Sequence, residues 1–121
     1  MTDHSPAAVV QRQHDAYNKR DIDSLLATYA EQARQFEFPA TLAASGAAQI
    51  RERMGVRFQE SDLHARLVQR AVMGNIVIDQ EVVTRNFPEG IGTVDVVAIY
   101  EVADGKIQSA TVQVNNKRLR G

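Results

Sequence analysis

Three polar side chains interrupt apolar rows of the sequence and are the first candidates for a binding site. Gln13 lies in an apolar helical row, Gln80 interrupts an alternating run of isoleucine and valine, and Tyr100 shares a row with valine and alanine. Small-molecule sites combine apolar walls with a few polar groups that orient the ligand. For Gln13 and Gln80, a ligand pocket and simple internal hydrogen bonding are both open interpretations. A structural role is favoured for Tyr100, because strand tyrosines commonly pack in sheets.

The titratable residues do not form a recognisable catalytic pattern. His4, His14 and His64 lack the spacing of metal ligands, and we expect them at the surface. Asp79 and Glu81 share one face of a predicted strand, where paired carboxylates can do acid–base work. We expect that face to be the outer one and the pair to form ion pairs. The sequence has no serine–histidine–acid order, glycine-rich phosphate loop or metal motif, so no metal and no cofactor are predicted.

The elements that would position these side chains begin with helices. Apolar residues recur with helical spacing over 5–17, 21–29 and 47–58. Between the second and third helices, 36–38 reads as a short strand and 40–46 as a turn-prone stretch of small residues. The N-terminal half of the chain is therefore predicted to be mainly helical.

From residue 63 the apolar period changes from 3.6 to 2. The predicted strands are 63–73, 76–87, 93–102 and 107–114, and Asp104-Gly105 is a strong signal for a tight hairpin. We expect residues 115–121 to form a solvated tail. Helices gathered on one side of an antiparallel sheet define the α+β class. A single domain, 1–121, with an ordered core of about 5–115, is the prediction.

Composition narrows the classes of protein that the chain can represent. It has 121 residues, which suits one domain with one core. The net charge of −1 offers no basic excess for nucleic acid or an anionic membrane. The absence of cysteine excludes disulfides and cysteine-ligated zinc. No signal peptide or transmembrane-length apolar run is present, so we expect a cytoplasmic protein.

Short motifs spread over most of the chain resemble one superfamily in their order and spacing. In that combination, the sequence is similar to nuclear transport factor 2-like proteins, including SnoaL-like and ketosteroid isomerase-like domains. The resemblance implies a cystatin-like cone, in which a curved antiparallel sheet packs against three N-terminal helices. The motifs are Val9-Val10-Gln11-Arg12, Tyr17-Asn18-Lys19-Arg20-Asp21-Ile22-Asp23, Tyr29-Ala30, Phe38-Pro39, Gly46 to Arg51, Gly74 to Glu81 and Ala98 to Ile107.

The resemblance also implies functional positions, and this sequence departs from them. Steroid isomerases of the superfamily use a carboxylate base and two donors, a tyrosine and a protonated aspartate. In this sequence Phe38 occupies the position of the base, Gln13 that of the tyrosine and Ala98 that of the aspartate. Counting without a gap from the first helix places Glu37 at the base instead. We prefer Phe38, because Phe36 and Phe38 then share the inner face.

The leading hypothesis is a SnoaL-like domain that holds a small apolar molecule in the cone, and whether it is catalytic stays open. One alternative is a non-catalytic dimerisation or interaction module with a filled cone. Another is an isomerase- or cyclase-type enzyme that uses Glu37 as its base. The predicted pocket residues are Gln13, Tyr17, Phe36, Phe38, Phe58, Gln80, Ala98, Tyr100 and Val112. A homodimer through the outer sheet face is predicted from Val68, Val72, Val77, Val83, Val97 and Ile99.

Overall fold

The computed structural model describes residues 3–120, and its first half contains three helices. They are α1 (Pro6–Lys19), α2 (Ile22–Leu26) and α3 (Ala47–Arg57). Ser5 caps α1 by accepting the amide of Ala8, and Asp21 caps α2 by accepting the amide of Ser24. Both caps satisfy amides that have no partner within the helix, so the helix starts follow from the local sequence.

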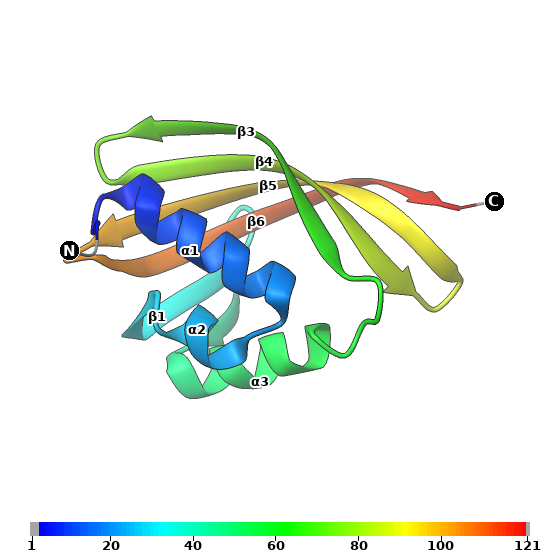
Figure 1. Ribbon diagram of the computed structural model, residues 1–121, viewed down its shortest axis with the longest axis horizontal. Helices are drawn as coiled ribbons and strands as arrows, with labels where there is room; N and C mark the ends of the chain where they lie inside the picture. The colour runs from blue at the N-terminus through cyan, green and yellow to red at the C-terminus, as the bar shows by residue number, and fades with distance from the viewer. Residues whose placement is uncertain (1–2, 121) are drawn as a thin grey trace.

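One six-stranded sheet makes up most of the rest of the chain (Figure 1). Its strand order is β2-β1-β6-β5-β4-β3, and all neighbours are antiparallel except β1 and β6. The curved sheet wraps partly around the helices. The strands are β1 (Tyr29–Glu37), β2 (Thr41–Ser45), β3 (His64–Met73), β4 (Ile76–Phe87), β5 (Gly90–Ala103) and β6 (Lys106–Leu119).

The main core lies between the helices and the inner face of the sheet. Val9 and Val10 of α1, Leu25 of α2, Ile50 of α3 and Ile107 of β6 are fully buried there. Figure 1 shows α1 lying across the sheet, with α2 and α3 beside β1. The predicted α+β cone with three N-terminal helices is confirmed. Within residues 3–120, no helix has the length and apolar character needed to cross a bilayer.

The predicted strand boundaries are wrong at two places in the sheet. Strand β1 begins at Tyr29, which we had placed in a helix, and β2 occupies the stretch predicted as a turn. In the middle of the sheet, β6 continues to Leu119 instead of ending in a solvated tail. Gly92 permits this extension, because a Cβ there would overlap the carbonyl oxygen of Arg118. Of the predicted domain 1–121, residues 1, 2 and 121 lie outside the described range.

The faces of β4 are the reverse of those predicted. Val77, Asp79, Glu81 and Val83 are buried against the helices, whereas Gln80 is exposed on the outer face. Both rows of this strand carry apolar side chains, so a period of two does not decide which row faces inward.

A β-bulge produces a related shift in β3. It lies between Leu67 and Gln69, and it turns Arg70 inward toward Asp79. An uninterrupted alternation from Leu63 would place Arg70 on the outer face instead. One additional residue in the strand reverses the phase of every residue after it.

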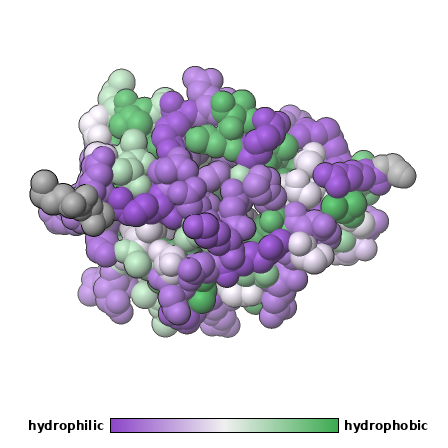
Figure 2. Space-filling view, viewed as in Figure 1, coloured by the Kyte–Doolittle hydropathy of each residue, from purple (hydrophilic) through white to green (hydrophobic). Residues whose placement is uncertain are grey.

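The outer sheet face consequently has a different apolar set from the predicted one. Val77 and Val83 are buried within the chain, and Val97 and Ile99 are half-buried. Val68, Met73 and Ile78 are exposed on this face, with 84% of Met73 accessible. Val72 pairs with the inward-facing Val77 and therefore does not belong to the outer face as predicted. In Figure 2, hydrophilic residues (purple) cover most of the helical face, and hydrophobic residues (green) gather along the upper edge over β3.

Candidate functional site

A cavity of about 540 Å³ lies inside the cone, between the helices and the concave face of the sheet. Its floor comes from the inward rows of β4, β5 and β6. Ala98 and Ala110 are small residues at neighbouring positions of this floor, and they leave space that larger side chains would fill. The remaining aliphatic floor residues are Val83, Val94, Val96, Val112 and Val114.

Two buried tyrosine hydroxyls lie in the cavity wall with different partners. Tyr100 donates to Oε1 of Gln13 over 3.3 Å. Tyr29 accepts from Nε2 of Gln35 over 3.4 Å, and Gln35 in turn accepts from the Arg53 guanidinium over 2.8 Å. Burial raises the pKa of Tyr29 to about 12 and that of Tyr100 well above its ordinary value. Both hydroxyls therefore stay protonated near neutral pH and can donate hydrogen bonds.

A second polar group joins α1 to β4 at the cavity wall. Nδ1 of His14 lies 3.0 Å from Oε2 of Glu81, and Nε2 lies 3.3 Å from the amide nitrogen of Asn18. Asn18 is fixed by two bonds to the backbone of Ala65, one accepted over 2.8 Å and one donated over 2.9 Å. The hydrogen bond to Glu81 raises the pKa of His14. Buried here, His14 is not the surface residue that we predicted.

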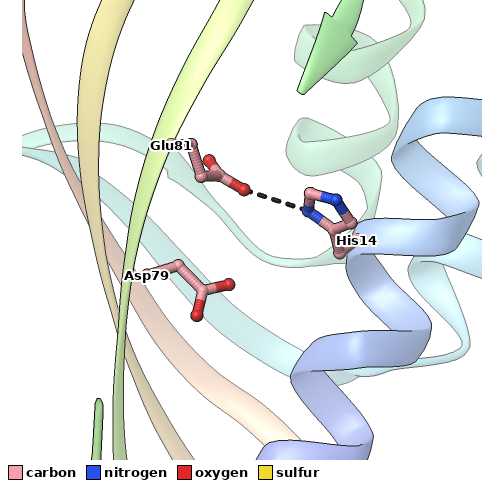
Figure 3. Close-up of side chains that lie close together, drawn as sticks. All are labelled: His14, Asp79 and Glu81. Carbon is pink, nitrogen blue, oxygen red and sulfur yellow. Dashed lines mark hydrogen bonds and ion pairs between the residues drawn. The ribbon is translucent and has the colours of Figure 1, made fainter. Parts of the chain in front are cut away.

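Asp79 lies beside this pair on the inner face of β4 (Figure 3). One ligand atom from each of His14, Asp79 and Glu81 falls within 4.8 Å of the others, as in a metal site. Arg70, however, donates to both carboxylate oxygens of Asp79 over 2.6 and 2.9 Å and to Gln11 over 2.8 Å. A metal ion would have to displace this guanidinium, so the arrangement fits a structural ion pair better than a metal centre.

Charged residues and one aromatic residue line the more open part of the cavity. Arg85 makes two bonds to Glu60 over 2.8 and 2.7 Å, so its charge is compensated. Glu37 and Phe38 also line the cavity, and Phe38 is 53% exposed. The polar residues at this side make the cavity amphipathic: its floor is apolar, and its rim carries charges.

A comparison with protein-family models shows to which family the chain belongs. A family model described as a SnoaL-like domain matches residues 10–110. The chain belongs to the SnoaL-like domain family. No curated protein shows significant similarity to the chain.

Solved structures show where this SnoaL-like domain lies among proteins of the same fold. A cystatin-fold protein from Novosphingobium aromaticivorans is 22% identical, with a TM-score of 0.83, over 89% of this chain and 97% of that one. An NTF2-like protein of unknown function from Cytophaga hutchinsonii is 15% identical, with a TM-score of 0.77, over 92% and 90%. A protein with a ketosteroid isomerase-like fold from Catenulispora acidiphila, in complex with trimethylamine, is 13% identical, with a TM-score of 0.75, over 86% and 82%. At these identities the likeness shows the fold alone.

The structure brings together six of the nine predicted pocket residues of this SnoaL-like domain. They are Gln13, Tyr17, Phe38, Ala98, Tyr100 and Val112, all of which line the cavity.

The other three predicted pocket residues do not line the cavity. Phe36 lies on the opposite face of β1, under the guanidinium of Arg34. Phe58 follows α3 and packs edge-on against Tyr17, with ring centroids 5.6 Å apart. Gln80 is exposed on the outer face of the sheet, so it cannot share a cavity with Gln13 as we predicted. Strand phase explains the errors at Phe36 and Gln80.

Sequence reasoning missed the most polar part of the site. His14, Glu81, Tyr29 and Gln35 line the cavity and were not predicted to do so. A signal for His14 was present, because His14 and Asn18 are four residues apart on α1 and therefore lie on one helix face. For Glu81 the sequence holds no comparable signal, since its position depends on the face of β4.

Proposed function

We propose that this SnoaL-like domain binds a small, largely apolar molecule inside the cone. The cavity of about 540 Å³ is the observation that carries the proposal, because its size falls in the usual range for small-molecule sites. Its apolar floor can bury a hydrophobic ring system, and Tyr29 and Glu81 offer a hydrogen-bond donor and an acceptor at the wall. The complex of the Catenulispora acidiphila protein with trimethylamine supports the idea that this fold holds small molecules.

The test uses two large substitutions at adjacent positions of β5. Ala98→Phe projects a ring into the cavity, whereas Ile99→Phe changes the opposite face of the same strand. The ligands are three neutral bicyclic compounds: 2-tetralone, 1-indanone and 2-naphthol. A ligand present at a hundred times its Kd stabilises a protein by about 2.7 kcal/mol, which a thermal melt detects readily.

We expect at least one compound to raise the Tm of the wild-type protein and of Ile99→Phe, but not that of Ala98→Phe. Each variant is first melted without ligand, because overpacking a core costs about 1–3 kcal/mol. Equal stabilisation of both variants would place the bound compound outside the cone and contradict the proposal. So would the absence of stabilisation by all three compounds.

We also propose that two chains associate through the outer face of β3 and β4. The exposed Val68, Met73 and Ile78 give this face more apolar surface than a solvated sheet needs. Light scattering at micromolar concentration should give twice the chain mass of 13.4 kDa. Ile78→Lys should return the mass to that of one chain, and a wild-type monomer would contradict the proposal.

A further inference from the structure

We infer that the cone binds an apolar molecule that carries a carboxylate, and that Arg53 and Arg57 hold this carboxylate at the edge of the cavity. The inference rests on the proposed function, since it names the class of molecule that the cone holds. The observation that carries it is a pair of half-buried guanidiniums for which residues 3–120 supply only a share of one carboxylate, that of Glu60.

Three arginines lie together at one side of the cone. Arg53, Arg57 and Arg85 line the cone cavity, and the same three residues line a second cavity of about 570 Å³ beside α3 and β2. Because they border both cavities, they lie at the edge of the cone. A molecule with a charged end and an apolar body can therefore place its charge at this edge and its body against the aliphatic floor.

Glu60 neutralises Arg85 and has little left to offer Arg57. Arg85 donates to both carboxylate oxygens over 2.8 and 2.7 Å, and the amide of Asn86 donates to Oε1 over 2.9 Å. Nε of Arg57 lies 3.6 Å from Oε2, beyond the length of a good hydrogen bond. The Tyr17 hydroxyl in the cavity wall supplies no negative charge, because burial raises its pKa.

The two other acids that line the cavity do not replace Glu60. Glu37 is exposed, and Glu81 is held by His14 over 3.0 Å. Among residues 3–120, neither acid forms an ion pair with Arg53 or Arg57. The charge of Glu37 affects the pKa of Arg53 less than burial and the charge of Arg57 do. The charge of these two arginines is therefore not balanced within the wall.

Arg53 and Arg57 also repel each other. They are four residues apart on α3 and lie on one helix face, where like charges destabilise a helix. The pKa of Arg53 is lowered, first by burial and then by the charge of Arg57. The folded protein keeps this pair at a cost in stability, and a carboxylate bound beside both guanidiniums would offset that cost.

The guanidinium of Arg53 is already positioned for such a ligand. Nη1 donates to Oε1 of Gln35 over 2.8 Å, and Nε2 of Gln35 donates to the hydroxyl of Tyr29 over 3.4 Å. No other residue between 3 and 120 accepts a hydrogen bond from Arg53. Every fully buried side-chain nitrogen in that range has a partner, so the remaining nitrogens of Arg53 are accessible. Two parallel N–H groups of a guanidinium match the two oxygens of a carboxylate.

The experiment compares 2-naphthoate with methyl 2-naphthoate by isothermal titration calorimetry near neutral pH. The two compounds share one ring system, and only the acid is charged. We expect 2-naphthoate to bind about tenfold more tightly or better, because hydrogen bonds between charged groups are stronger than neutral ones. Arg57→Gln should weaken binding of 2-naphthoate by about tenfold and that of the ester by less than about threefold.

Arg51→Gln is the matched control. It makes the same change of charge on the same helix, but Arg51 lines neither cavity and forms an exposed ion pair with Asp23. Its affinity for 2-naphthoate should equal that of the wild type. Without ligand, Arg57→Gln should not lower the Tm, because the substitution removes a repulsion. A structural role for Arg57 would instead lower the Tm and weaken both compounds equally.

Two further variants test the charge and the place of binding. Arg57→Lys keeps the charge but loses the planar fork, so it should bind 2-naphthoate more tightly than Arg57→Gln and less tightly than the wild type. Ala98→Phe fills the floor and leaves the arginines intact, so it should bind neither compound, whereas Ile99→Phe should bind both. Wild-type affinity of Ala98→Phe for 2-naphthoate would place the acid outside the cone and overturn the inference.

The outcomes separate this inference from the proposed function. Equal binding of 2-naphthoate and its ester, or equal binding of 2-naphthoate by the wild type and Arg57→Gln, would overturn the carboxylate site. Inorganic phosphate bound as tightly as 2-naphthoate would reveal a site for free anions and overturn the assignment of an apolar acid. In each of these cases, stabilisation by a neutral bicyclic compound would leave the proposed function intact. If neither the neutral compounds nor 2-naphthoate bind, both proposals fail.

Discussion

The ion pair between Arg70 and Asp79 should be one of the strongest single contributors to the stability of this domain. Two hydrogen bonds, of 2.6 and 2.9 Å, join the groups, and their side chains are 15% and 1% exposed. Arg70→Met removes the cation and leaves a buried carboxylate without a counter-charge. Hydrogen bonds to charged groups contribute about 1.5–3 kcal/mol each, and removing one partner of a buried pair typically costs about 3–5 kcal/mol.

A loss of that size would be a large part of the total stability, which for single domains is about 5–15 kcal/mol. We expect Arg70→Met to lower the free energy of unfolding by about 3–5 kcal/mol in urea titrations. Arg118→Met is the matched control, because Arg118 contacts Asp95 over a similar 2.7 Å but both side chains are far more exposed. The control should change the stability little, since solvent screens exposed ion pairs.

The double variant Arg70→Met, Asp79→Leu shows whether the loss of stability comes from the buried carboxylate that is left without a counter-charge. If the cost comes from the stranded carboxylate, removing that carboxylate should recover much of the stability, because apolar replacements of buried ion pairs are often neutral. If Arg70→Met destabilises the domain no more than Arg118→Met, then Asp79 is not buried as described and the reasoning is refuted.

The remaining predictions concern the pH dependence of His14. Since Glu81 raises the pKa of His14 in the folded protein, the pair stabilises the fold fully below about pH 6.5, the ordinary histidine value, and progressively less as the pH rises through the folded pKa. Urea titrations from pH 5.5 to 8.5 should show this decline for the wild type and a smaller one for Glu81→Gln. NMR titration should also give a lower pKa for His14 in Glu81→Gln, and an unchanged value would show that Glu81 is not the cause.

The helical half of the fold could be predicted from sequence because its signals are local. Ser5 and Asp21 mark helix starts by their ability to cap, and Ile50 and Met54 mark the buried face of α3 by their spacing. Each of these signals depends on contacts within a few residues. The hairpin at Asp104-Gly105 is of the same kind, and it joins β5 to β6 as predicted.

The candidate site could be predicted only where one face of a strand is clearly apolar. On β5 the row that contains Val94, Val96 and Ala98 has no charged residue, whereas the opposite row contains Asp95 and Glu101, and the inward direction of the first row was predicted correctly. On β4 both rows are rich in valine and isoleucine. We therefore predicted Gln80 on the inner face and Glu81 on the outer face, and the structure has the opposite arrangement. The buried position of Glu81 depends on α1, which supplies His14 from 67 residues away. A contact between residues so far apart in the sequence produces no periodic pattern in either segment.

The bulge in β3 has a consequence for how this domain tolerates changes in length. Val68 has no partner on β4, since Leu67 pairs with Glu81 and Gln69 pairs with Gln80. Deleting Val68 would remove the bulge and leave Arg70 opposite Asp79, because Gln69 would then follow Leu67 in an uninterrupted alternation. A one-residue insertion elsewhere between Leu67 and Arg70 would instead shift the phase again and direct Arg70 away from the carboxylate that it neutralises. When homologous strands are aligned, a one-residue gap at Val68 is therefore compatible with the same buried ion pair on the neighbouring strand.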